Sequence, residues 1–275
     1  MMNIQRFLVA STILVCITAN LHSQAPEAVV DTAPTTDPKK LFEPRQYVAD
    51  NGDQLNYRLL KPADYTPDNY DPNQKYPLVV FLHGAGERGS DNTAQLMHGL
   101  AEFCRPERRQ EFPCYVLAPQ CPKDQKWVDL DWSQPQPDYP ESISRPLELT
   151  LQVVEAMLDD AAIDKSRVLL TGLSMGGYGT WDALARRPEL FAAGLPICGG
   201  GDTTQAAKFK HIPVWCFHGS DDEVVHPDRS REMVAALRAA GGEPRYTEYA
   251  GVKHDSWSQT FANAQTFQWL FTQKK

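Results

Sequence analysis

The segment Gly172-Leu173-Ser174-Met175-Gly176 constrains the fold of this chain more than any other, because it separates a strand-like run from a helix-like run. Residues 167–171 are expected to form a strand and residues 175–187 a helix. A G-x-S-x-G pattern at such a turn holds the serine in a strained backbone conformation, for which the flanking glycines leave room. The serine hydroxyl then projects from the sheet edge, near a helix N-terminus that favours developing negative charge. The pattern predicts Ser174 as a nucleophile, and the alternative is a glycine-rich turn with an ordinary N-cap serine.

The rest of the chain alternates between strand-like and helix-like runs. Strands are expected at 46–48, 54–60, 77–82, 115–118, 167–171, 191–198, 213–217 and 245–249. Helices are expected at 146–160, 175–187, 228–240 and 257–273. The turn Asp50-Asn51-Gly52-Asp53 favours a hairpin between the first two strands. The unbroken apolar run at 77–82 is typical of a parallel strand that is buried on both faces. The order predicts an α/β fold with a mostly parallel central sheet, an N-terminal β-hairpin and helices on both faces.

Size and charge narrow the functional classes. A chain of 275 residues that is 42% hydrophobic can bury one sizeable core, and no repeat or second domain is visible. The formal net charge of −8 argues against nucleic-acid binding, which needs a basic face. It also argues against attachment to an anionic membrane through charge alone. No feature of the sequence specifies an oligomeric state.

The N-terminus has the pattern of an export signal. Arg6 supplies a positive charge, residues 7–17 form an almost uninterrupted apolar run, and small residues follow at 19–25. The apolar run is short for a bilayer span, so residues 1–25 are predicted to be a cleaved signal peptide and the protein to be secreted or periplasmic. The alternative is a retained membrane anchor. Residues 26–40, rich in Pro, Thr, Asp and Ala, are expected to be a flexible linker before a catalytic domain at 41–275.

Cysteine usage allows a disulfide but does not require one. Outside the export segment, Cys104, Cys114 and Cys121 lie close together in sequence, which permits a disulfide among them in an oxidising compartment. Cys198 and Cys216 lie in apolar runs and are expected to be small buried hydrophobes. No Cys/His spacing resembles a zinc site, so no metal is predicted.

A nucleophilic serine needs a base and a group that orients it. His254 follows the last expected strand, and Asp222 follows the strand at 213–217. We therefore predict His254 as the general base and acid, and Asp222 as its orienting carboxylate. Asp221 and Glu223 are alternatives for the carboxylate. His226 is a weak alternative for the base, because it lies on the acid loop itself.

The oxyanion hole should consist of two backbone N–H groups. One is predicted at Met175, directly after the nucleophile. The other is predicted at Ala85, with Gly84 as the alternative, in the small-residue loop His83-Gly84-Ala85-Gly86. His83 is expected to support this loop, and His218 to have a structural role at the end of its strand.

These motifs together carry a family resemblance. They are His83 to Gly89, Gly172 to Trp181, Pro196 to Asp202, His218-Gly219-x-x-Asp222 and His254-Asp255-Ser256-Trp257. They resemble the secreted α/β-hydrolase carboxylesterases related to dienelactone hydrolases, polyhydroxyalkanoate depolymerases and feruloyl esterases, often labelled peptidases or phospholipases. The resemblance covers roughly residues 45–272. It implies ester hydrolysis through an acyl-enzyme on Ser174, with no metal or organic cofactor.

Aromatic side chains are candidates for the substrate pocket. Residues 119–146 are rich in proline and lack periodicity, which favours a long functional loop. Trp127 in this loop, Tyr178 after the nucleophile and Trp257 after the base are predicted to line the substrate site; core packing is the alternative for each. Glu87 and Arg88 either cap the mouth or form a surface ion pair.

The absence of a large inserted lid suggests an open cleft. Such a cleft suits phenolic, sugar-linked or polymeric esters, so the expected partner is a small-molecule or polymer-linked ester. A serine peptidase with the same triad is the alternative function. A non-catalytic binding protein would be expected to lack a triad residue, and none is missing from the sequence.

Overall fold

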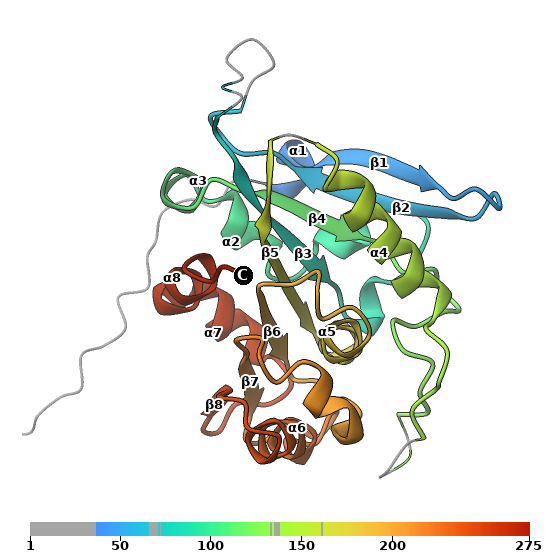
Figure 1. Ribbon diagram of the computed structural model, residues 1–275, viewed down its shortest axis with the longest axis vertical. Coiled ribbons are helices and arrows are strands. Elements are labelled where there is room, and N and C mark those ends of the chain that lie inside the picture. Colours follow the sequence, from blue (N-terminus) through green and yellow to red (C-terminus); the bar gives the residue numbers. More distant parts are fainter. Residues whose placement is uncertain (1–36, 66–70, 72, 133, 135–137, 161) are drawn as a thin grey trace, which may run out of the picture. The chain divides into compact units, whose positions relative to one another are not determined.

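The computed structural model describes residues 37–65, 71, 73–132, 134, 138–160 and 162–275, and within them the strands form a single mixed sheet (Figure 1). Its order is β1-β2-β4-β3-β5-β6-β7-β8. The strands are β1 Glu43–Val48, β2 Gln54–Leu60, β3 Tyr76–Leu82, β4 Tyr115–Pro119, β5 Ile163–Leu173, β6 Ala193–Ile197, β7 Trp215–Gly219 and β8 Arg245–Tyr249.

The antiparallel part of the sheet is the N-terminal hairpin. Strand β1 pairs antiparallel with β2, and β2 pairs antiparallel with β4. Gly52 in the connecting turn has φ 89°, a conformation that glycine adopts without strain. The strands from β4 to β8 pair in parallel. The predicted α/β-hydrolase architecture, with its hairpin and mostly parallel sheet, is confirmed.

Helices cover both faces of the sheet (Figure 1). Strand β3 is buried along its whole length, and its side chains alternate between two cores. The larger helices are α4 Arg145–Met157, α5 Met175–Arg186, α6 Asp228–Ala239, α7 Ser256–Ala262 and α8 Ala264–Phe271. The short ones are α1 Pro38–Leu41, η2 Ala85–Glu87, η3 Ala94–Leu96, α2 Leu100–Cys104, α3 Pro106–Glu111 and η4 Thr203–Lys208. Leu78, Val80 and Leu82 belong to the core that also contains residues of α4, α5 and α6, whereas Val79 and Phe81 belong to the core that contains residues of α2, α7 and α8.

Several element boundaries differ from those expected. The single helix expected at 257–273 is wrong: α7 and α8 are separate, because Asn263 has an extended conformation and its side chain caps α8 by accepting from the Gln265 amide at 2.9 Å. Strand β5 starts before the expected 167–171, since Ile163 pairs with Tyr76. Strands β6 and β7 begin two residues later than expected and β7 extends to Gly219, where it pairs with Tyr249.

The linker predicted at residues 26–40 ends earlier than expected. Residues 38–40 are helical in α1, which starts where the Asp37 side chain accepts from the Lys39 amide at 3.0 Å. The predicted signal peptide at 1–25 and the linker at 26–36 lie outside the described residues. Every helix in the described part of the chain is too short or too polar to cross a bilayer.

The cysteines of the described residues are all free thiols, and all are buried. The disulfide that the sequence permits among Cys104, Cys114 and Cys121 is not formed. Cys198 and Cys216 are fully buried, as expected for small apolar residues.

Candidate active site

Ser174 occupies the sharp turn between β5 and α5. Its backbone has φ 53° and ψ −116°, a conformation that a residue with a side chain rarely adopts. A Cβ on Gly172 would lie 2.3 Å from the Gly176 carbonyl oxygen, and one on Gly176 would lie 1.9 Å from that of Leu82. The turn is therefore possible only because both flanking residues are glycine. The Ser174 amide donates to the Ile197 carbonyl at 2.9 Å, which fixes the turn to the end of β6.

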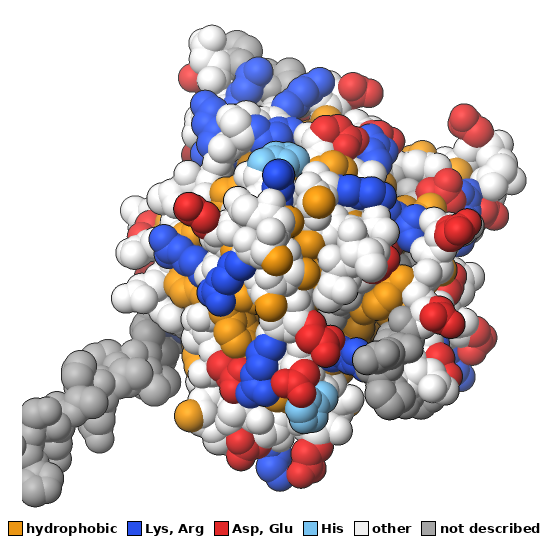
Figure 2. All heavy atoms as spheres, turned by 60° about the horizontal axis from the view of Figure 1, so that its bottom comes forward, with side chains coloured by type: hydrophobic (Ala, Val, Ile, Leu, Met, Phe, Trp, Pro, Cys, Tyr) orange, Lys and Arg blue, Asp and Glu red, His pale blue; other side chains and the backbone are white. Residues whose placement is uncertain are grey.

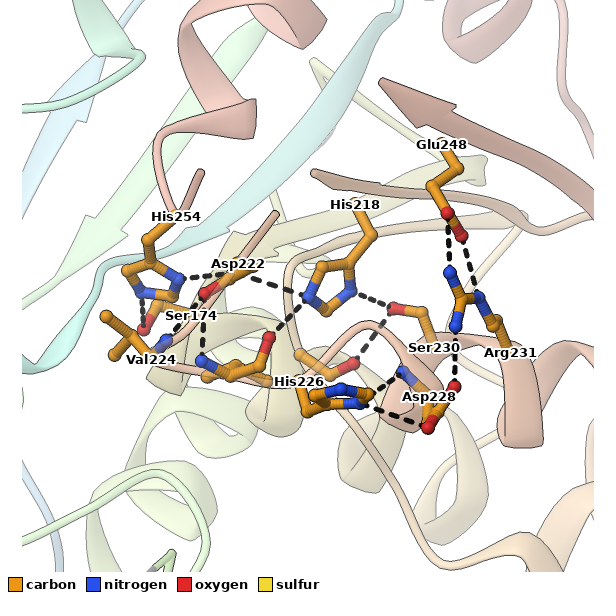
Figure 3. A network of polar contacts seen from close by, with 12 residues as sticks. Ser174, His218, Asp222, Val224, His226, Asp228, Ser230, Arg231, Glu248 and His254 are labelled. Carbon is orange, nitrogen blue, oxygen red and sulfur yellow. Dashed lines mark hydrogen bonds and ion pairs between the residues drawn. The ribbon is translucent and has the colours of Figure 1, made fainter. Parts of the chain in front are cut away.

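The hydroxyl of Ser174 begins a chain of two hydrogen bonds (Figure 3). Its Oγ lies 2.9 Å from Nε2 of His254, and Nδ1 of His254 lies 2.7 Å from Oδ2 of Asp222. Because an ionised carboxylate only accepts, Nδ1 carries the hydrogen and Nε2 is left free to accept from the serine. This tautomer can remove a proton from Ser174 and keep a carboxylate beside the imidazolium that results.

Asp222 is a buried carboxylate with a full set of donors. Its side chain has no exposed surface. Oδ1 accepts from the amides of Val224 and Val225, each at 2.9 Å, and Oδ2 lies near both His254 and His218. Burial alone would raise the pKa of this carboxyl, but the hydrogen bonds from His218, His254 and Val225 outweigh it and hold the pKa below its usual range. Asp222 therefore stays ionised at neutral pH.

The carboxylate that contacts His254 in the structure is Asp222, and not Asp221 or Glu223. Asp221 and Glu223 are exposed neighbours, and Asp221 accepts from Ser220 Oγ at 2.6 Å. His226 has a side chain that is 68% exposed and pairs with Asp228 at 3.1 Å. None of the three contacts the serine in the described structure.

The acid loop and the base loop are fixed to each other by the backbone. A Cβ on Gly219 would lie 2.2 Å from the Val252 carbonyl oxygen, so this position must be glycine for the loops to meet. The Asp221 amide donates to that same Val252 oxygen at 3.0 Å, and the Gly251 amide donates to Ser220 Oγ at 2.8 Å. These contacts therefore fix Asp222 and His254 relative to each other.

Among the described residues, the backbone amides of Ala85 and Met175 have no protein acceptor, and neither does that of Gly84, the alternative donor. Ala85 begins η2 and Met175 begins α5, where the first amides lack intrahelical partners. The loop that carries Ala85 lies close to the serine, because a Cβ on Gly84 would be 3.7 Å from that of Ser174. The arrangement leaves both predicted oxyanion donors available.

The buried ring of His83 supports this loop through two hydrogen bonds. Its Nδ1 donates to the Gly84 carbonyl at 2.6 Å, and its Nε2 accepts from the Cys121 amide at 2.9 Å. Burial lowers the pKa of His83 to about 4, so the ring is neutral. The Arg88 side chain braces the same loop by donating from Nε to the Ala85 carbonyl at 2.8 Å. Arg88 therefore supports the loop, and the ion pair with Glu87 considered from the sequence is not formed.

The three aromatic residues predicted to line the substrate pocket differ in position. Trp127 is 0% exposed, so its predicted place in the pocket wall is wrong: its indole packs against Gly179 and bonds to the backbone of His83. Tyr178 is 5% exposed and packs with Val128 and Leu130. Trp257 is the half-buried one, and its ring centroid lies 5.2 Å from that of His254.

Sequence reasoning missed two contacts at the site. His98 lies between Trp257, whose ring centroid is 5.4 Å away, and the buried Glu87, whose Oε1 is 3.5 Å from Nε2. The His218 ring contacts Asp222 directly, at 3.2 Å. The four-residue spacing of His218 and Asp222 around a strand end was the available signal for that contact.

A group of possible metal ligands coincides with this site. One ligand atom each of Cys198, Asp222 and His254 lies within 4.8 Å of the others. Cys198 has φ 40° and is fully buried, and burial raises the pKa of its thiol well above the usual range. Since Asp222 and His254 are already bonded to each other, the group is part of the serine site and not a separate centre.

The chain is similar to known esterases in sequence and in fold. The family described as Phospholipase/Carboxylesterase matches residues 70–270. A solved structure of a thermostable esterase is 42% identical with a TM-score of 0.78, and the match covers 86% of this chain and 64% of that one.

Two curated relatives are more distant. The poly(3-hydroxyalkanoate) depolymerase C of Paucimonas lemoignei is 32% identical over 209 residues, which are 64% of this chain and 45% of the relative. A secreted protein of Arthroderma benhamiae is 25% identical over 235 residues, which are 74% of this chain and 24% of the relative. The chain thus spans less than half the length of these two relatives.

Proposed function

Because the chain belongs to the phospholipase/carboxylesterase family of α/β-hydrolases, we propose that it hydrolyses carboxylic esters with Ser174 as the nucleophile. The observation that carries this proposal is the chain of contacts from Ser174 Oγ to His254 Nε2 at 2.9 Å, and from His254 Nδ1 to Asp222 at 2.7 Å. A serine hydroxyl in contact with a base that is itself oriented by a carboxylate is the arrangement that nucleophilic catalysis needs.

The steps follow from the positions of these groups. Ser174 Oγ attacks the ester carbonyl carbon while His254 Nε2 takes its proton, and Asp222 stabilises the imidazolium. The carbonyl oxygen, now negative, accepts from the amides of Ala85 and Met175. His254 returns the proton to the leaving alcohol oxygen, which leaves an acyl group on Ser174. Water then attacks the acyl-enzyme by the same route in reverse. No metal or organic cofactor is needed for these steps.

The surroundings of the serine support an open site for esters with an apolar or aromatic part. Trp257 presents a half-buried indole beside His254, and Val224, two residues after Asp222, is 72% exposed. On the face shown in Figure 2, acidic and basic side chains are interspersed, so the net charge of −8 is not gathered there. The half-buried indole of Trp257 and the exposed Val224 support a phenolic, sugar-linked or polymeric ester as the proposed substrate.

Residues 1–25 supply the export signal of the proposed enzyme, and residues 41–275 supply its catalytic domain. The pattern of Arg6 and the apolar run at 7–17 supports this, as does the similarity to a secreted fungal protein. The site of action would then be the periplasm or the medium.

The test is hydrolysis of p-nitrophenyl acetate, a long-chain p-nitrophenyl ester, a feruloyl ester and a peptide anilide. Ser174→Ala should lower kcat on the preferred ester by about 10⁶-fold. Asp222→Asn should lower it by about 10⁴-fold, because the wrong histidine tautomer is favoured. Asp221→Asn is the matched control and should change kcat by less than about twofold. Anilide cleavage without ester preference would favour the peptidase alternative, and activity that survives Ser174→Ala would exclude the proposed mechanism.

A further inference from the structure

His218 lies near the end of β7 and has no contact with solvent. Its side chain is 0% exposed and makes three polar contacts (Figure 3). Nδ1 lies 2.7 Å from Oγ of Ser230 on α6. Nε2 lies 2.8 Å from the Val225 carbonyl oxygen and 3.2 Å from Oδ2 of Asp222. The ring therefore joins the strand, the acid loop and α6 at one point.

The contacts of Nε2 decide where one hydrogen lies. A backbone carbonyl can only accept, and Asp222 is ionised because its donors hold its pKa below the usual range. A bare Nε2 would face two acceptors and bond to neither. Nε2 of His218 therefore carries a hydrogen, which is shared between Val225 and Asp222.

Asp222 is consequently the acceptor for two imidazoles. Oδ2 accepts from His254 at 2.7 Å and from His218 at 3.2 Å. Both contacts draw on the charge of the same oxygen. The more of that charge His218 takes up, the less is available to stabilise the imidazolium form of His254.

Taking the triad of the proposed function as given, we propose that His218 is a positioning residue that shares Asp222 with His254 and lowers the pH at which His254 becomes protonated. The base then stays neutral, and able to accept from Ser174, to a lower pH than it would with Asp222 to itself.

The other ionisable groups near His218 are compensated or neutral. Glu248 on β8 accepts from Arg231 at 2.6 and 2.9 Å and from Tyr246 at 2.6 Å, so its charge is matched locally. Burial raises the pKa of Cys216, on the same strand, to about 12, and the pKa of Cys198 is raised as well. Among the described residues, Asp222 is thus the ionised side chain that contacts both His218 and His254.

The first experiment is the pH profile of kcat/KM for p-nitrophenyl acetate. In His218→Leu the acid limb should move to higher pH by about half to one unit, since one unit corresponds to the loss of a modest hydrogen bond to a charged group. His218→Gln keeps an N–H near the same acceptors and should return the limb toward its wild-type position. Ser230→Ala removes the contact on the far side of the ring and should leave the limb in place. A rate that falls equally at every pH in His218→Leu would show that the residue is only structural.

An NMR titration tests the same inference without catalysis. The His254 ring should titrate at higher pH in His218→Leu than in wild type, and in wild type Nε2 of His218 should carry a hydrogen. A bare Nε2 would overturn the proposal, even if His218→Leu does not fold. If wild type cleaves no ester but the His254 titration shifts, the proposed function fails and the role of His218 stands. If esters are cleaved and the titration does not shift, the proposed function stands and the proposed role of His218 fails.

Discussion

The indole Nε1–H of Trp127 donates to the backbone carbonyl oxygen of His83 over 2.9 Å, and this bond joins Trp127 to the loop of the proposed oxyanion hole. The two rings also meet edge to face, with centroids 5.2 Å apart. Ser144 donates from Oγ to the Trp127 carbonyl at 2.7 Å, so the tryptophan is held from both sides. Trp127 therefore supports the backbone at His83 from the core, and its fully buried ring is out of reach of a substrate.

Replacing Trp127 by Phe should destabilise the fold. Phe fills most of the volume but cannot donate, which leaves the buried His83 carbonyl without a partner. We expect a loss of about 1–3 kcal/mol in the free energy of unfolding, measured by urea denaturation. Trp257→Phe is the control, and should change stability little while altering KM for aromatic esters. Equal loss in both variants would contradict the supporting role of Trp127.

The oxyanion loop offers a matched pair of glycines. A Cβ on Gly84 would lie 2.9 Å from Glu87 Oε2 and 3.0 Å from Leu173 Cδ1, whereas one on Gly86 would meet no atom within 4 Å. Gly84→Ala should therefore displace the loop and lower kcat by about 10- to 100-fold, up to the cost of losing one oxyanion donor. Gly86→Ala should keep wild-type kcat. If the two variants behave alike in steady-state assays, the Ala85 amide is not the second donor.

His83 predicts how stability depends on pH. Its pKa falls from 6.5 to about 4, because burial removes the ring from water and so disfavours its charged form. The unfolded chain then binds this proton first as the pH falls, so the folded state loses stability from about pH 6.5 down to about pH 4. The loss attributable to His83 should reach about 3 kcal/mol.

The comparison variant for this prediction is His83→Gln, which can donate to Gly84 and accept from Cys121 without titrating. Denaturation between pH 7 and pH 4 should show a shallower slope in this variant than in wild type. Parallel slopes would mean that His83 is not the group responsible. Asp222, whose pKa is depressed, acts in a separate window: its contribution is complete above pH 3.8 and is lost as the pH falls below that value.

Much of the fold was predictable, because the relevant signals are local. The turn at Ser174 needs glycine on both sides for steric reasons, and the unbroken apolar run of β3 reports burial on both faces. The break between α7 and α8 was not predictable from periodicity, since apolar residues recur on both sides of Asn263. The start of β5 was missed because residues 164–167 are polar and lie in an irregularity of the strand, between the pairs Tyr76–Ile163 and Leu78–Val168.

The same contrast holds for the site. The order Ser174, Asp222, His254 along the chain is enough to propose a triad, because each residue follows a strand whose end lies at one edge of the sheet. The role of Trp127 could not be predicted, because it depends on the direction in which the indole points. Trp127 lies in a long irregular segment, where no periodicity indicates that direction. The contact of His218 with Asp222 likewise depends on the fold of the acid loop, which the backbone amides of Val224 and Val225 shape.

The thiols should be protected in the folded protein and reactive in the unfolded one. Cys104, Cys114 and Cys121 are buried, and burial raises the pKa of each to about 12, so very little thiolate forms near neutral pH. Alkylation mapped by mass spectrometry should therefore label none of them in native protein within minutes, and all of them after unfolding without reductant. Adding reductant should leave Tm unchanged, because no disulfide contributes to the fold of the described residues. A pair that reacts only after reduction, together with a Tm lowered by reductant, would show that two of these cysteines are joined after export into an oxidising compartment.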